Sequence, residues 1–146
     1  MSIKFKINSK GFDLAVANIS KKAALQVMRI DGIIEQNVQD AANNAKSNLP
    51  AKYSDLASSI NVVKKQELQY QLRADKDYAA YVEFGTGESA AEYVPSLEPE
   101  WQKLAESYYV NGEGKLDEEP YFYPAVKDMW SKMIKEIQKT TNARYK

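Results

Sequence analysis

Residues 78–87 read Tyr-Ala-Ala-Tyr-Val-Glu-Phe-Gly-Thr-Gly, and this stretch decides how the rest of the chain is divided. Every second residue from Tyr78 to Phe84 is apolar or aromatic, a period of two that predicts a strand with one buried face. The structural turn Gly85, Thr86, Gly87 then redirects the chain, and we expect its glycines to have positive φ. Nucleotide-binding loops need a further glycine or a lysine at fixed spacing, so this turn predicts no phosphate site.

The longest regular pattern precedes this stretch. From Phe12 to Ala45, apolar residues recur at spacings of three and four, which lines one face of a helix reaching about Asn48. Pro50 closes this helix, because the residue before a proline is pushed out of the α region. Residues 51–58 are expected to form a polar loop.

Four short runs show the alternation typical of strands, and short connections favour antiparallel pairing between neighbours. The runs are residues 3–7, 60–63, 68–73 and 78–84.

The chain after the glycine turn changes in character. Residues 88–119 are acidic and rich in Gly and Pro, with a single short helix predicted from Pro99. We expect this insertion to be mobile in the free subunit, because one narrow apolar stripe offers little to hold it. A last helix is predicted from Pro124, and residues 141–146 are expected to fray.

The predicted fold class is α+β: an antiparallel sheet of three to four strands packed against a long N-terminal helix and a C-terminal helix, with an acidic insertion. We expect a single domain over residues 1–146. Its core is assigned to residues 1–87 and 120–140, with the insertion at 88–119 and the frayed tail at 141–146.

Composition narrows the possible functions. The chain of 146 residues contains no cysteine and no histidine, which removes disulfides, thiol nucleophiles, imidazole acid–base chemistry and zinc-finger ligands. Its acidic residues show no calcium-loop spacing, so we predict no metal and no cofactor. Paired carboxylates of the kind used in glycoside hydrolysis stay open, but no pair stands out, so we predict no catalytic residue and no enzyme. No apolar run is long enough to cross a membrane, and the start does not resemble a signal peptide, so we expect the protein to stay in the cytosol unless something carries it out.

Charge is segregated along the chain although basic and acidic residues balance at 20 each. Residues 1–74 hold 11 basic and 6 acidic residues, residues 75–119 hold 3 and 12, and residues 120–146 hold 6 and 2. Such a distribution fits ordinary solvated faces, and it equally fits copies that dock an acidic face on a basic face.

Aromatic residues are concentrated after residue 70, in the acidic part of the chain, where they favour protein contacts over a specific nucleic-acid site. Packing in the core accounts for part of them. The candidate interface residues, which include one neighbouring acid, are Tyr78, Tyr81, Glu83, Tyr93, Trp101, Tyr121, Phe122 and Tyr123.

The order of three motifs resembles a known family. These are the long helix closed by Pro50 ahead of Ser54-Asp55-Leu56, the stretch of residues 78–87, and Pro120-Tyr121-Phe122-Tyr123-Pro124-Ala125. Together they resemble the gene-product-ten-like tail-component family of long-tailed, non-contractile bacteriophages, over about residues 12–87 and 120–140. The acidic insertion lies outside the resemblance.

The resemblance implies a structural role without catalysis: a neck, head–tail connector or tail-completion protein that assembles as a homo-oligomeric ring at the head–tail junction. Its partners would be itself and other phage neck and tail proteins, with DNA passing through the ring. It would be found in the virion, and in the host cytoplasm during assembly. The alternative is a small non-enzymatic adaptor or inhibitor that binds a host protein through its acidic insertion.

Overall fold

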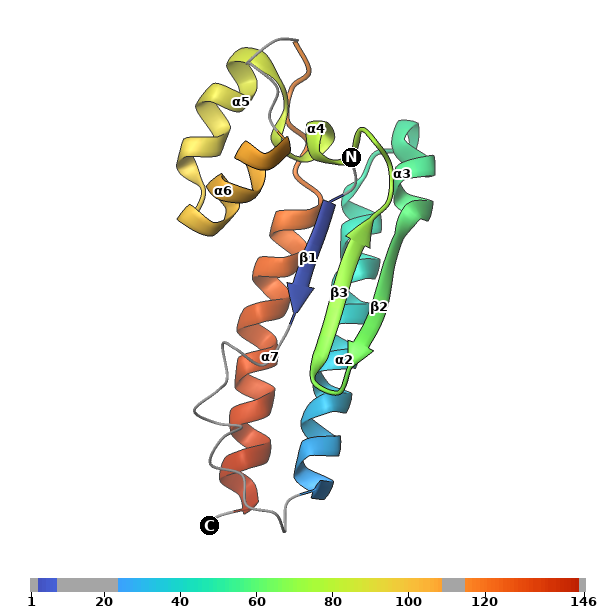
Figure 1. The fold of residues 1–146 in the computed structure, drawn as a ribbon, viewed down its shortest axis with the longest axis vertical. Coiled ribbons are helices and arrows are strands. Elements are labelled where there is room, and N and C mark those ends of the chain that lie inside the picture. Colours follow the sequence, from blue (N-terminus) through green and yellow to red (C-terminus); the bar gives the residue numbers. More distant parts are fainter. Residues whose placement is uncertain (1–2, 8–23, 109–114, 145–146) are drawn as a thin grey trace.

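Two long helices form the spine of the molecule. The computed structural model describes residues 3–7, 24–108 and 115–144. Helix α2 (Ala24–Asn48) and helix α7 (Phe122–Arg144) lie side by side along the longest axis (Figure 1). Asn37 joins them: its side-chain Nδ2 donates to the Ile33 carbonyl at 2.8 Å and to Glu136 Oε2 at 3.2 Å. The predicted long helix is thus confirmed from Ala24 onward, and its part over residues 12–23 lies outside the described residues.

An antiparallel sheet packs against α2. Strand β3 (Gln69–Ala74) is central, with β1 (Ile3–Ile7) on one side and β2 (Ile60–Gln66) on the other (Figure 1). Leu72 of β3 faces Phe5 and Val62 in the two registers and is fully buried. The α+β class, with an antiparallel sheet, a long helix and a C-terminal helix, is confirmed.

The strand predicted over residues 78–84 is wrong. This stretch forms the short helix α4 (Ala79–Phe84). Five of its six residues are buried, on all sides of the helix, so alternation along the sequence does not reflect a single buried face. For a short run buried on every side, periodicity cannot separate strand from helix, and the paired alanines favour the helix.

The predicted polar loop over residues 51–58 is also helical. It consists of the 3-10 turn η3 (Ala51–Tyr53) and helix α3 (Ser54–Ser59), whose Leu56 is fully buried. One buried leucine is enough to hold this turn against the core. At the other end of the chain, α7 continues to Arg144, and the fraying expected of residues 141–146 stays a prediction.

The described part of the acidic insertion contains more helix than the single short helix that the sequence predicts. It contains α5 (Gly87–Tyr93), the 3-10 turn η4 (Val94–Ser96) and α6 (Pro99–Tyr108), at one end of the molecule (Figure 1). The helix start at Pro99 is confirmed. Leu97, Trp101 and Ala105 belong to the main hydrophobic core. The mobility expected of residues 88–119 in the free subunit stays a prediction, which hydrogen exchange would test.

Candidate functional site

A buried carboxylate lies where the motif at residues 78–87 meets the start of α7. Glu83 of α4 has no exposed surface. Its Oε2 accepts the backbone N–H groups of Tyr121 at 2.9 Å and Phe122 at 2.8 Å, and its Oε1 accepts that of Tyr123 at 3.0 Å. Both oxygens are therefore occupied by backbone donors. Glu83 acts as a side-chain cap brought in from another helix.

This cap accounts for every free N–H at the start of α7. A helix leaves its first four backbone N–H positions without partners inside the helix. Here the first three bind Glu83, and the fourth is Pro124, which has no N–H. The negative charge also faces the positive end of the helix dipole. A glutamate at position 83 and a proline at position 124 are thus two parts of one arrangement.

Two opposing effects act on the pKa of Glu83. Burial removes the charged form from water and raises the pKa to about 7, from an ordinary value of 4.5. The three backbone N–H groups act in the other direction, because they stabilise the carboxylate. Glu83 is consequently an acid that titrates near neutral pH inside the subunit.

The glycine turn holds the two ends of the insertion together. Gly85 has φ of 74° and Gly87 has φ of 60°, which confirms the predicted positive-φ turn. The Thr86 N–H donates to the Leu116 carbonyl at 2.9 Å, and the Leu116 N–H donates back to Thr86 Oγ1 at 2.9 Å. A Cβ on Gly85 would lie 2.9 Å from the backbone nitrogen of Glu118, so no side chain fits there.

An aromatic group joins the insertion to the start of α7. The Trp101 ring meets the Tyr123 ring edge-on, with centroids 4.9 Å apart, and lies 6.2 Å from the Phe122 ring. The Tyr123 hydroxyl donates to the Glu98 carboxylate, and Lys127 Nζ lies 3.8 Å from the same carboxylate. These contacts tie α6 to α7 at the acidic end of the molecule.

A second buried acid connects the sheet to α2. Asp31 accepts hydrogen bonds from Lys64 Nζ at 2.9 Å, the Leu68 N–H at 2.8 Å and the Tyr70 hydroxyl at 2.9 Å. Burial raises the pKa of Asp31, but these three donors outweigh it and hold the pKa below its ordinary value. Leu68 has φ of 65° in the β2–β3 turn, and the bond from its N–H to Asp31 helps to hold that conformation.

The candidate interface residues separate into two groups. Tyr78 is 37% exposed, and Tyr81, Tyr93 and Tyr123 are half-buried, so these four tyrosines reach the surface. The other four were expected at an interface because of their residue type, but the subunit itself buries them and they serve its core. They are Glu83, Trp101, Tyr121 and Phe122.

The described residues contain no group of three or more acidic side chains arranged to hold a metal ion. Among the same residues, no helix is both long and apolar enough to span a membrane.

Comparison with known families decides the identity. The model of the family described as "Bacteriophage HK97-gp10, putative tail-component" matches residues 13–85, which is half of the chain. The chain belongs to this family. Searches among curated proteins and among solved structures gave no match. The tail-component match ends at the glycine turn, while the segment it does not cover supplies the start of α7 that Glu83 caps.

The sequence did not reveal what Glu83 does. It was noted as a candidate contact residue, whereas the structure makes it the link between two motifs 38 to 40 residues apart. One signal was available: Glu83 is the lone charge in a run of apolar residues, and such a charge needs a partner if it is buried. The partners are backbone groups, which no residue pattern displays.

Proposed function

We propose that this protein is a structural, non-enzymatic subunit of the bacteriophage head–tail junction, a neck or tail-completion ring subunit needed for virion assembly. Membership of the tail-component family carries the proposal. The family description places it among tail components, and the junction, the ring and the need for assembly are our extension of it.

The arrangement of Glu83 supports a structural role. An acid that serves as general acid or base must reach a substrate. Both oxygens of Glu83 are instead held by the backbone of residues 121–123, and Asp31 is held by three donors of its own subunit. These two buried acids connect elements of the fold.

The distribution of charge supports assembly of copies. The segment of α5, η4 and α6 carries Glu88, Glu92, Glu98, Glu100 and Glu106 against Lys103 alone. Helix α7 carries five basic residues against two acidic ones, and it runs away from that segment to the opposite end of the molecule (Figure 1). Contacts between unlike patches form rings when the rotation between neighbours closes.

Deletion of the gene from the phage tests the proposal. We expect lysates that contain DNA-filled heads and separate tails, as seen by electron microscopy, and that regain infectious particles when the gene is supplied from a plasmid. Infectious particles of normal form without the gene would contradict the structural role. They would favour the adaptor alternative, which also predicts a protein that remains monomeric or dimeric.

A further inference from the structure

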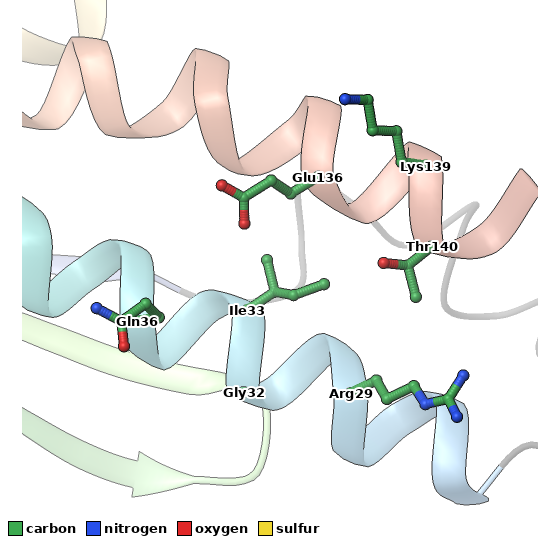
Figure 2. Close-up of a pocket in the computed structure, with 7 residues that line it drawn as sticks. All are labelled: Arg29, Gly32, Ile33, Gln36, Glu136, Lys139 and Thr140. Carbon is green, nitrogen blue, oxygen red and sulfur yellow. The ribbon is translucent and has the colours of Figure 1, made fainter. Parts of the chain in front are cut away.

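At one end of the molecule, two apolar side chains among the described residues are exposed. Leu25 and Met28, on the first turns of α2, are 61% and 64% exposed. Beside them, an open groove of about 650 Å³ runs between α2 and α7 (Figure 2). Ile33 points into it from α2, and the charged residues that line it are Arg29, Lys139 and Glu136, two basic and one acidic. We call this region the basic end.

Nothing in the part of the chain that the structure describes explains why residue 32 in this groove is a glycine. It lies in the interior of α2, where glycine disfavours the helix relative to alanine. A Cβ at Gly32 would meet nothing within 4 Å, so no described part of the subunit requires a glycine there. The missing side chain widens the groove, which is what the close approach of another molecule would need.

The opposite end of the molecule carries an apolar pocket that could receive such side chains. A pocket of about 230 Å³ lies among α5, η4 and α6. Its walls are apolar and small, including Ala90, Ala91, Val94 and Ala105, with Glu106 at its edge. A cavity of about 150 Å³ is enough to bind benzene, so this pocket has room for an aliphatic side chain. We call this region the acidic end.

We propose that the basic end of one copy binds the acidic end of a second copy, with Leu25 and Met28 entering the alanine-walled pocket. This inference rests on the ring proposed above and names the surfaces that build it. The two ends have opposite charge, so approach in this orientation is favoured and approach of like ends is disfavoured. The occupant of the pocket is therefore another copy of this chain.

The contact is heterologous, since each copy uses a different surface toward each neighbour. Such a contact leaves one free basic end and one free acidic end after every addition, until the ring closes or a filament grows. A symmetric dimer would instead use the same surface twice and stop at two copies. This difference makes the proposal testable.

Cysteine cross-linking tests the contact directly, because the natural chain contains no cysteine. The double variant Met28→Cys with Ala91→Cys places one thiol at each end, and both positions are exposed. On oxidation we expect a ladder of disulfide-linked multimers, in concentrated full-length protein or in purified particles. Either single variant can link no more than two copies. The matched control, Met28→Cys with the exposed position Asn44→Cys, should give no ladder.

A second variant measures the strength of the contact. Ala91→Glu adds a charge where the apolar side chains would enter, and we expect it to weaken self-association about tenfold or more, while Ala91→Ser leaves it unchanged. Purified particles that contain the protein, combined with no ladder from the double-cysteine variant in particles or in solution, would contradict the proposed contact. The proposed role at the junction would be unaffected. Infectious particles of normal form from a phage that lacks the gene would instead contradict the role at the junction.

Discussion

Glu83 shows how one residue can fix the start of a helix far away in the sequence. Replacing it by Gln keeps its size but leaves one oxygen for three backbone N–H groups, and puts an NH₂ donor against the N–H of Tyr123. We expect Glu83→Gln to lower the free energy of unfolding at neutral pH by about 2 kcal/mol, the cost of a buried donor without an acceptor. Urea unfolding measures it.

The control for this variant is Glu88→Gln, at an exposed position on α5. We expect its free energy of unfolding to stay within about 0.5 kcal/mol of the natural protein. Equal stability of the two variants would mean that the cap at α7 is unimportant.

Glu83 also gives stability a pH dependence. Its pKa is 4.5 in the unfolded chain and about 7 in the folded one. Between these values the unfolded chain has lost a proton that the folded chain keeps, so stability falls as pH rises through this window. Asp31 has the opposite effect: because folding lowers its pKa, the stability that it contributes is lost as pH falls below 3.8. We therefore expect urea unfolding to show a decline toward pH 7 that Glu83→Gln removes. An unchanged decline in that variant would assign it to another group.

We expect Gly85→Ala and Gly32→Ala to change the free energy of unfolding in opposite directions. At Gly85, alanine must adopt φ of 74° and approach the Glu118 nitrogen to 2.9 Å, so we expect Gly85→Ala to cost about 2 kcal/mol or more. At Gly32, alanine meets open space in a helix, and we expect a gain of about 0.5–1 kcal/mol. Thermal unfolding of both variants compares them. Effects of the same sign would contradict the geometry.

Among the elements, the β2–β3 hairpin depends on a single side chain of α2. Asp31→Asn removes the charge that faces Lys64 and leaves one acceptor oxygen for three donors. We expect faster hydrogen exchange in the hairpin near Leu68, with little change in α7, and a loss of about 1–3 kcal/mol. Exchange that accelerates equally throughout would indicate global unfolding instead. Lys65→Met, at the exposed neighbouring position, is the control.

The long amphipathic helix α2 was predictable from the sequence, whereas the buried helix α4 was not. The face of α2 carrying Ile30, Ile34 and Val38 repeats every three or four residues, so its helix is visible in the sequence. In α4, residues on every side are buried, and the same alternation that predicted a strand arises by coincidence. The contacts of α6 were not predictable for a related reason: Trp101 meets the rings of Phe122 and Tyr123 at the start of α7, and local composition does not record partners so distant in the sequence.

On the scale of the whole molecule, the charge carried by its two ends predicts how assembly responds to salt. Charges that meet between copies are screened beyond about 8 Å at physiological ionic strength and over shorter distances at higher salt. We expect the mass of the oligomer, measured by light scattering, to fall as salt is added. Assembly that is indifferent to salt would mean that the acidic end faces elsewhere, such as the channel through which DNA passes.

The pairing of α2 with α7 also determines when, during synthesis of the chain, the groove between them can form. Asn37 and Glu136, which meet across the two helices, are 99 residues apart in the chain. Such a contact cannot form before both residues have left the ribosome, and the N-terminal part of a growing chain leaves first. Arg29 would leave the ribosome long before Lys139 exists to complete the groove. In a nascent or truncated chain that lacks α7, the groove beside Leu25 and Met28 is incomplete, so we expect only subunits with a complete α7 to present the whole basic end.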